Sequence, residues 1–283
     1  MTGFCVLGCG TMGKALLTGI FDSIKEQDEQ ASKNISVPDK FYACVKFVQE
    51  AIEIEKLFAG DVGISVTDEE NVQKAAASDV LLLSCKPQGA EDVLGAPGMK
   101  EALKGKLILS ILAGKTIDSL KNLLDDSTRI IRIMPNTASR IRESMSVLCP
   151  APNATEADVE FAEWAFNGIG RTMKLPEKLI DASTAMCGSG PAFVATMIEA
   201  MTDGGVMMGI PFAQAQELAA QTMVGTGQMV LQGQHPAKIR NDVSTPAGCT
   251  ISGLLALEDG KIRSTIARGI EQATKTASGL GNN

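Results

Sequence analysis

The chain has 283 residues, 45% hydrophobic and 21% charged, which is enough for one large domain or two smaller domains with their own cores. Its formal net charge of −7, without a polybasic segment, argues against nucleic-acid and membrane-surface partners. Seven cysteines without a CxxC pair argue against disulfides and a zinc site. Because no long apolar run is free of polar interruptions, the sequence predicts a soluble, cytoplasmic protein without a bound metal.

A glycine-rich segment lies near the N-terminus. The short apolar run Phe4–Leu7 is followed at once by Gly8-Cys-Gly-Thr-Met-Gly13 and then by residues with helical spacing. A strand, a GxGxxG segment and a helix in this order bind the pyrophosphate of a dinucleotide. The same letters begin a nucleoside-triphosphate loop, but Ala15 occupies the position of its Ser or Thr. The predicted cofactor contacts here are Leu7, Gly8, Cys9, Gly10, Thr11, Met12 and Gly13.

The second predicted strand, Lys40–Phe47, bears on the choice between the two nicotinamide cofactors. Sites that prefer NADH usually place a carboxylate near the end of this strand, where it binds the ribose 2′-hydroxyl. Here the end reads Cys44-Val-Lys46, with no carboxylate and one cation. We therefore expect NADPH, with Lys46 facing its 2′-phosphate, while a solvated Lys46 and the use of NADH stay open.

Six further segments are predicted strands. They are Val62–Val66, Asp79–Lys86, Lys106–Ala113, Arg129–Asn136, Met145–Cys149 and Arg171–Leu175. Apolar runs that alternate with helical segments are typical of a parallel sheet covered on both faces. The sequence thus predicts an α/β fold with a Rossmann-type, doubly wound, mostly parallel sheet. The turns after these strands are expected to line one crevice, since ligands lie beyond the carboxyl ends of parallel strands.

The composition changes near Pro176, and the rest of the chain is predicted to be all α-helical. The run Ile180–Met208 is apolar on nearly all sides, and Gly188-Ser-Gly-Pro191 inside it is expected to kink it or to start a new helix. So few residues can hardly bury such a helix alone, which indicates a partner subunit. We predict a dinucleotide-binding domain at 1–175 and a helical substrate and dimerisation domain at 176–283.

The stretch Asn241–Glu258 begins with turn-forming and hydroxyl residues and then becomes apolar at helical spacing. This pattern predicts a helix start with Pro246 just inside it. Free N–H groups at such a start attract a carboxylate or phosphate, and Gly248 lets the backbone approach the ligand closely. An ordinary capped helix is the alternative interpretation.

This stretch resembles the C-terminal signature of pyrroline-5-carboxylate reductases, a Val-Ser/Thr-Ser-Pro-Gly-Gly-x-Thr loop that opens a helix. Ala247 replaces the first glycine, Thr245 replaces a serine, and Asn241-Asp242 replaces a usual Asp-x pair. The turns Ser84–Pro87, Ile111–Gly114 and Met134–Thr137 also resemble the family in order and spacing. The segments CGSGPAF and MTDGGVMMGIP do so as well, so the resemblance covers both halves of the chain.

The resemblance implies reduction of the C=N bond of 1-pyrroline-5-carboxylate to proline, with Thr250 catalytic because the matching hydroxyl points at the ring nitrogen. It also implies a homodimer, or a higher homo-oligomer of dimers, in which both chains complete each active site. The further cofactor contacts that it implies are Asn71, Cys85, Lys86, Pro87, Ala113, Gly114, Asn136 and Asp242. The substrate contacts that it implies are Glu177, Val243, Thr245, Gly248, Cys249 and Thr250.

Several alternatives stay open at this point. Lys86 and Asn136 are also typical turn residues, Glu177 is also typical of a solvated junction, and the single histidine, His235, fits a loop better than an acid. A β-hydroxyacid-type dehydrogenase is a rival, but the segment Pro191–Met197 lacks the lysine that such enzymes use. A non-catalytic NADPH-binding redox sensor is the rival from another class, and the departures from the family signature are its only support.

Overall fold

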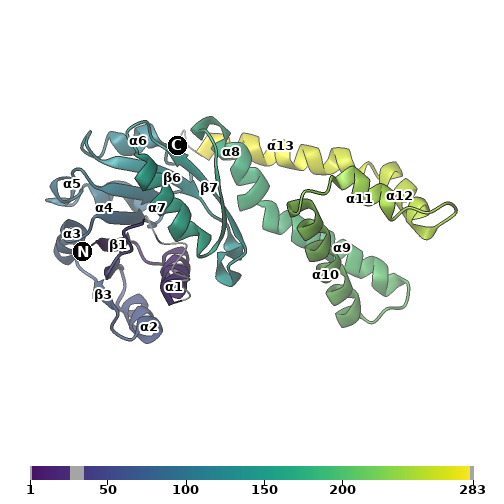
Figure 1. Cartoon of the computed structure of the whole chain (residues 1–283), viewed down its shortest axis with the longest axis horizontal. Coiled ribbons are helices and arrows are strands. Elements are labelled where there is room, and N and C mark those ends of the chain that lie inside the picture. The colour runs from purple at the N-terminus through teal and green to yellow at the C-terminus, as the bar shows by residue number, and fades with distance from the viewer. Residues whose placement is uncertain (1, 26–34, 281–283) are drawn as a thin grey trace. The chain divides into compact units, whose positions relative to one another are not determined.

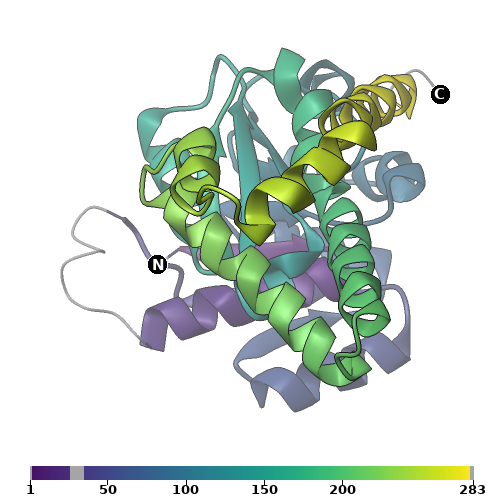
Figure 2. The same cartoon turned by 90° about the vertical axis from the view of Figure 1, so that its right-hand side faces the viewer.

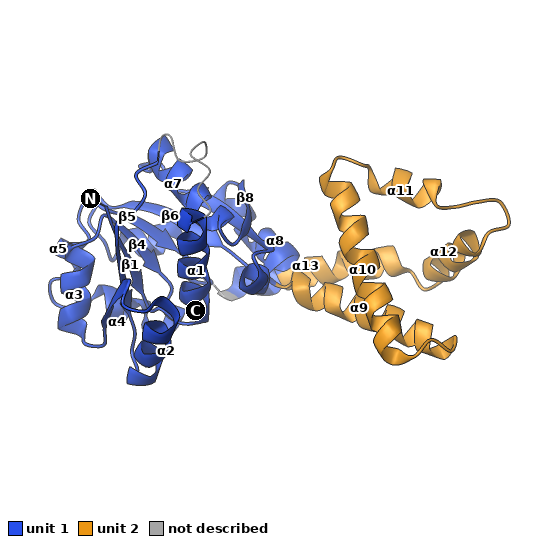
Figure 3. Cartoon of the chain, turned by 60° about the horizontal axis from the view of Figure 1, so that its bottom comes forward, with its two compact units in different colours: residues 1–188, 274–283 blue, residues 189–273 orange. Residues whose placement is uncertain are grey.

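The structure is a computed structural model in which residues 2–25 and 35–280 are described (Figure 1). The chain folds into two compact units, one formed by residues 1–188 and 274–283 and the other by residues 189–273 (Figure 3). The predicted domain division between residues 175 and 176 stays a prediction.

The first unit is built on one sheet with the strand order β3-β2-β1-β4-β5-β6-β7-β8. Neighbouring strands are parallel except for β6 and β7, which are antiparallel. The order of the first six strands is that of doubly wound dinucleotide-binding folds, so the predicted fold class is confirmed. The strands are β1 (Gly3–Leu7), β2 (Lys40–Cys44), β3 (Val62–Ser65), β4 (Val80–Leu83), β5 (Leu107–Ser110), β6 (Arg129–Met134), β7 (Ser144–Pro150) and β8 (Gly170–Lys174).

Helices cover both faces of this sheet, and the sheet separates two hydrophobic cores. Side chains of a strand alternate between the faces, so Phe4 and Val6 of β1 join one core while Cys5 and Leu7 join the other. The first core is closed by α1 (Thr11–Lys25), α2 (Val48–Phe58) and α7 (Glu156–Asn167). The second is closed by α3 (Asp68–Ala76), α4 (Ala90–Leu94), α5 (Met99–Ala102) and α6 (Ile117–Lys121). Short 3₁₀ turns complete the unit at η1 (Pro87–Gly89), η2 (Thr137–Ile141) and η3 (Glu177–Leu179).

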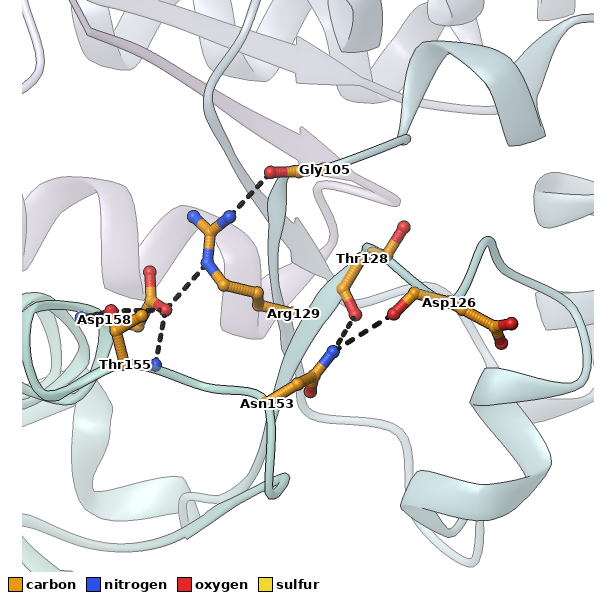
Figure 4. Close-up of polar contacts among 7 residues, drawn as sticks. All are labelled: Gly105, Asp126, Thr128, Arg129, Asn153, Thr155 and Asp158. Carbon is orange, nitrogen blue, oxygen red and sulfur yellow. Dashed lines mark hydrogen bonds and ion pairs between the residues drawn. The ribbon is translucent and has the colours of Figure 1, made fainter.

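A polar network secures the start of β6 (Figure 4). Arg129 donates to Asp158 Oδ2 at 2.7 Å and to the Gly105 carbonyl at 2.6 Å. The same carboxylate oxygen accepts the backbone N–H and the hydroxyl of Thr155, the residue that caps α7. Asn153 donates to the carbonyls of Asp126 and Thr128. Because these contacts lie where β6 begins, they brace the edge of the sheet opposite to the carboxyl ends.

The second unit is entirely helical, as predicted. At the end of the first unit's residues 1–188, a π-helical turn, η4 (Thr184–Gly188), follows α8 (Ile180–Ser183). The second unit's α9 begins two residues after it at Gly190, so the predicted break in this run is confirmed. Helices α9 and α10 pack on each other (Figure 2), with Ala215 and Ala219 buried. The helices are α9 (Gly190–Met207), α10 (Phe212–Leu231), α11 (Pro236–Asp242), α12 (Cys249–Asp259) and α13 (Ile262–Leu280), the last of which continues into residues of the first unit.

The second unit has almost no core of its own. Of its residues, the structure buries Thr202, Ala215 and Ala219. Large apolar side chains are exposed instead, for example Met207 at 81% and Phe212 at 60%. In the described ranges, 2–25 and 35–280, no helix is long and apolar enough to cross a membrane. Exposed apolar surface of this extent is typical of an interaction site.

Candidate active site

The turn between β1 and α1 has the geometry of a pyrophosphate cradle. Gly8 has a φ of +87°, and a Cβ there would lie 2.5 Å from the backbone of Cys85, so the position requires glycine. At Gly13 a Cβ would lie 2.9 Å from Val6, which brings helix and strand into close contact. At Gly10, by contrast, no atom lies within 4 Å of such a Cβ, so this side of the backbone is open. A dinucleotide fits this open side.

The start of α1 supplies hydrogen-bond donors to the same place. The first helical bond runs from the Lys14 N–H to the Gly10 carbonyl at 2.9 Å. The amides of Thr11, Met12 and Gly13 precede it, and amides at such a position have no carbonyl within the helix to bind. Together with the positive end of the helix dipole they favour an anion. The structure thus brings the predicted contacts of the glycine segment together at the start of α1, and their contact with a cofactor stays a prediction.

Two neighbouring strands hold this turn in place. The backbone N–H groups of Gly8 and Cys9 both donate to the carbonyl of Cys44, the last residue of β2, at 3.0 and 2.9 Å. Ser84, just after β4, donates its hydroxyl to the Gly8 carbonyl at 2.9 Å. The glycine turn therefore adjoins the segment Cys85–Pro87, where three further cofactor contacts are predicted. Sequence reasoning missed this role of Ser84, because a serine after a strand carries no distinctive signal.

The thiols nearest the cradle are packing groups. Cys9 is 1% exposed, and burial raises the pKa of its thiol to about 12. Burial also raises the pKa of the Cys85 thiol. Both side chains are therefore neutral near pH 7, and their contribution to the turn is shape rather than charge.

Two predicted cofactor residues lie near the carboxyl ends of β2 and β3. Lys46 follows β2 and is exposed, and the segment 44–46 carries no carboxylate. Asn71 lies on α3, half-buried, with its Oδ1 2.6 Å from the hydroxyl of Ser65 at the end of β3. Both predicted cofactor residues thus lie at the carboxyl edge of the sheet, as does the glycine turn.

The turns after β5 and β6 reach the same edge. Ala113 is exposed, and Gly114 has a φ of +74°, a conformation that suits glycine. Asn136 precedes η2, where its Oδ1 accepts the Ala138 N–H at 3.0 Å and its own N–H donates to Ser144 Oγ at 3.0 Å. Asn136 therefore has the turn-stabilising role that was its alternative interpretation, and its contact with a cofactor stays a prediction.

Glu177 lines a pocket of about 360 Å³ within the first unit, together with Gly114, Thr116, Arg132 and Lys178. Its Oε1 accepts the Arg132 guanidinium at 2.9 Å and the Ile117 backbone N–H at 2.8 Å. In the described part of the chain, both hydrogen bonds that this carboxylate accepts use Oε1. Arg132 was missed from the sequence, although a cation inside the apolar strand RIIRIM is a usable signal.

The remaining predicted residues lie in the second unit, from the end of α11 through the loop after it to the first turn of α12. The Gly248 N–H donates to the Thr245 carbonyl at 3.0 Å, and Ala247 between them has a φ of +56°. Helix α12 begins at Cys249 with Gly248 as its cap, so the prediction that Pro246 lies just inside the helix is wrong. The turn from Thr245 to Gly248 delays the helix by three residues.

Thr250 lies in the first turn of α12, partly exposed, next to the exposed Cys249. Val243 is 61% exposed, and Asp242 forms an ion pair with Lys238 within α11. The predicted site residues therefore form two groups, one at the carboxyl edge of the sheet and one from the end of α11 to the first turn of α12.

A doubly wound sheet with a glycine cradle between its first strand and helix defines the class of nicotinamide-dependent Rossmann-fold oxidoreductases. The family model described as NADP oxidoreductase, coenzyme F420-dependent, matches residues 3–114. The model described as pyrroline-5-carboxylate reductase dimerisation matches residues 177–280.

Known proteins narrow this class further. The pyrroline-5-carboxylate reductase of Schizosaccharomyces pombe is 80% identical over 281 residues, which cover 99% of this chain and all of the relative. That of Neurospora crassa is 42% identical, covering 98% and 92% of the two chains. A crystal structure of Plasmodium falciparum pyrroline carboxylate reductase with NADP bound matches with a TM-score of 0.80 and 26% identity, covering 99% and 98%. The chain belongs to the pyrroline-5-carboxylate reductase family, and the resemblance seen in its sequence is confirmed.

Proposed function

We propose that this chain reduces 1-pyrroline-5-carboxylate to L-proline, the last step of proline biosynthesis, with NADPH as the hydride donor. The observation that carries the proposal is the full-length 80% identity to a curated reductase of that name. The intact glycine cradle supports it independently, because each of its three glycines meets the demand that a bound pyrophosphate makes.

NADPH, when bound, supplies the hydride, and the protein supplies position and charge. The cradle Leu7–Gly13 would hold the pyrophosphate, and the turns Cys85–Pro87, Ala113–Gly114 and the side chain of Asn136 would lie along the rest of the cofactor. Lys46 is the cation at the end of β2, and the missing carboxylate there favours NADPH over NADH. The solved relative with NADP bound points to the same cofactor.

Thr250 is proposed as the catalytic residue, with its hydroxyl hydrogen-bonded to the ring nitrogen of the substrate. Its place in the first turn of α12 leaves the amides of Cys249 and Thr250 free to bind the substrate carboxylate. Val243, Thr245 and Gly248 shape the loop before them, and Asp242 at the end of α11 is proposed to contact the cofactor.

Glu177 is proposed as a further substrate contact near the ring nitrogen. Its Oε1 is already engaged by Arg132 and Ile117, which fixes the carboxylate in one position. The oxygen that remains for a substrate is Oε2. A carboxylate held in this way favours a protonated imine, which is the better hydride acceptor.

A second copy of the chain is proposed to cover the apolar surface of the second unit. That unit exposes large side chains along α9, α10 and α12, for example Met207, Leu218 and Leu255. The matching family model is described as a dimerisation domain, which supports a homodimer or a higher homo-oligomer of dimers. We propose that the active site is completed by both chains, and that the functional division lies between residues 175 and 176.

A cytoplasmic location is proposed for the protein. Each of its seven cysteines is free, and free thiols persist in reducing compartments.

The test of the proposed function is an assay of the purified protein with 1-pyrroline-5-carboxylate, following NADPH and then NADH by absorbance and proline by chromatography. Turnover that yields one proline per NADPH consumed is expected, with a higher kcat/KM for NADPH than for NADH. A protein that binds NADPH but turns over no imine would instead fit the redox sensor.

A further inference from the structure

A short chain of hydrogen bonds joins the glycine turn to Asn71. It begins at the Cys44 carbonyl, which accepts the N–H groups of Gly8 and Cys9. The Cys44 side chain lies against the Ser65 hydroxyl, with 3.2 Å between Sγ and Oγ. That hydroxyl in turn lies 2.6 Å from Asn71 Oδ1. The three side chains come from β2, β3 and α3, which meet at the carboxyl edge of the sheet.

Ser65 is held rigidly in this chain. Cys44 and Ser65 are paired in register on neighbouring strands, and the Val45 N–H donates to the Ser65 carbonyl at 3.0 Å. Ser65 is only 1% exposed and Cys44 is 2% exposed, so water does not compete for the Ser65 hydroxyl. A buried hydrogen bond between fixed partners sets the orientation of the group that it binds.

The proton count decides what Asn71 offers to a ligand. A serine hydroxyl has one proton and an amide oxygen only accepts, so the 2.6 Å contact uses the Ser65 proton on Asn71 Oδ1. The amide oxygen is then engaged, and the Nδ2 group keeps two donors for other acceptors. Within the described part of the chain, the Nδ2 group of Asn71 donates to no acceptor. Asn71 is half-buried.

The end of β2 is where doubly wound folds bind the adenosine ribose of a dinucleotide, usually through a carboxylate. This chain has no carboxylate in the segment 44–46, and Asn71 is the amide tied to that strand end. We propose that Ser65 is a positioning residue, which holds Asn71 so that its Nδ2 donates to the adenosine half of NADPH. The proposal rests on the proposed function for the identity of the cofactor and on the predicted contact of Asn71 with it, and the role of Ser65 is what it adds.

The test measures binding by calorimetry without any imine substrate. NADPH is compared with 2′,5′-ADP, which represents the adenosine half, and with reduced nicotinamide mononucleotide, which represents the other half. Ser65→Ala is expected to weaken NADPH and 2′,5′-ADP about 3- to 10-fold and to leave the mononucleotide unchanged. In the double variant with Asn71→Ala, binding of 2′,5′-ADP should be no weaker than in Asn71→Ala alone, because Ser65 acts through Asn71.

Ser78→Ala is the matched control. Its hydroxyl is also buried and also donates within the first unit, to the Lys74 carbonyl at 2.9 Å, so it loses a similar hydrogen bond without touching Asn71. Its affinities should equal those of the wild type. If Ser65→Ala does not fold, Asn71→Ala alone decides, since an unchanged affinity for 2′,5′-ADP in that variant overturns the proposal. The proposal is also overturned if Ser65→Ala weakens binding of 2′,5′-ADP and of the mononucleotide equally. It is likewise overturned if the double variant binds 2′,5′-ADP more weakly than Asn71→Ala, by the factor that Ser65→Ala causes alone.

Failure of this proposal is separate from failure of the proposed function. A wild-type chain that binds NADPH without reducing 1-pyrroline-5-carboxylate leaves every one of these binding comparisons intact.

Discussion

Arg132 and Glu177 form an ion pair of 2.9 Å between the sixth strand and the segment that follows the last strand. The Arg132 side chain is 7% exposed, so its charge needs a partner inside the protein. The same carboxylate oxygen accepts the first backbone N–H of α6. One carboxylate therefore fixes three elements around the pocket that Glu177 lines.

Removal of this carboxylate should cost stability. Glu177→Ala leaves the Arg132 guanidinium buried and unpaired, so we expect the free energy of unfolding in urea to fall by about 1–3 kcal/mol. Glu177→Gln keeps an acceptor for both donors and should lose less. Glu91→Ala is the control, because its pair with Lys115 lies at the surface and contributes under about 1 kcal/mol. If Glu177→Ala and Glu91→Ala lower the free energy of unfolding equally, the buried pair adds no more stability than the surface pair, which contradicts this prediction.

The two glycines of the cradle should respond differently to the same added methyl group. Gly8→Ala places a Cβ against the Cys85 backbone at a positive φ, so we expect a loss of about 2–4 kcal/mol and a Tm lower by roughly 5–15 °C. Gly10→Ala meets no neighbour, so its Tm should be that of the wild type while NADPH binding weakens by about tenfold. Thermal melts and calorimetry check both variants. A wild-type Tm for Gly8→Ala is the contradicting result.

Ala247 pays a conformational cost that glycine does not. Its φ of +56° is left-handed, which costs a residue with a Cβ about 1–2 kcal/mol, whereas glycine loses about 0.5–1 kcal/mol of chain entropy. Ala247→Gly should therefore raise stability by roughly 0.5 kcal/mol. Ala247→Val should lower it relative to the wild type, because a β-branched residue adopts a positive φ less readily than alanine. Urea unfolding of the two variants is the measurement, and the reverse order of stability would contradict the turn geometry.

Asp158 should make stability depend on pH in acid. Burial opposes ionisation of this carboxyl, but hydrogen bonds from Arg129 and from Thr155 outweigh it and hold its pKa below the usual range. A lowered pKa in the folded state means that the stabilisation is present above the unfolded value of about 3.9 and is lost as the pH falls through the folded value. Asp158→Asn should cost about 1–3 kcal/mol at pH 7 and progressively less below about pH 4.

Urea unfolding of the wild type and Asp158→Asn at several pH values measures this difference. A gap that stays constant from neutral pH into the acid range would mean that the carboxylate charge contributes nothing.

Thr250 should matter to catalysis and not to folding. If its hydroxyl binds a charged ring nitrogen, Thr250→Ala should lose about 1.5–3 kcal/mol in the transition state, or roughly 10- to 150-fold in kcat/KM, with an unchanged Tm. Thr250→Ser keeps the hydroxyl and should retain most of the activity. Steady-state kinetics decide the matter, and a loss below about twofold in a folded Thr250→Ala protein removes this residue from the mechanism.

Much of the fold was predictable because apolar runs mark buried parallel strands directly. The predicted strand Asp79–Lys86 is observed as Val80–Leu83, and the polar residues at its ends belong to the flanking turns. Likewise Lys40–Phe47 is observed as Lys40–Cys44, because the glycine turn binds the Cys44 carbonyl and the chain bends away after it. The glycine segment was readable for a similar reason, since its spacing encodes a local turn.

What escaped prediction depends on contacts between distant segments. Arg132 stands out as a cation inside an apolar strand, but neither local sequence shows that its partner is Glu177, 45 residues further along the chain. Ser65 and Asn71 meet through the packing of α3 on the sheet. The late start of α12 follows from a backbone turn at Ala247, a residue that seldom adopts a positive φ.

The most direct test of the central claim follows the hydride itself. NADPH carrying deuterium at the transferable position is incubated with the protein and 1-pyrroline-5-carboxylate, and the product is analysed by mass spectrometry and NMR. The account predicts proline with one deuterium on the ring carbon that was double-bonded to nitrogen. Proline without deuterium, or no proline from protein that binds NADPH, would contradict it.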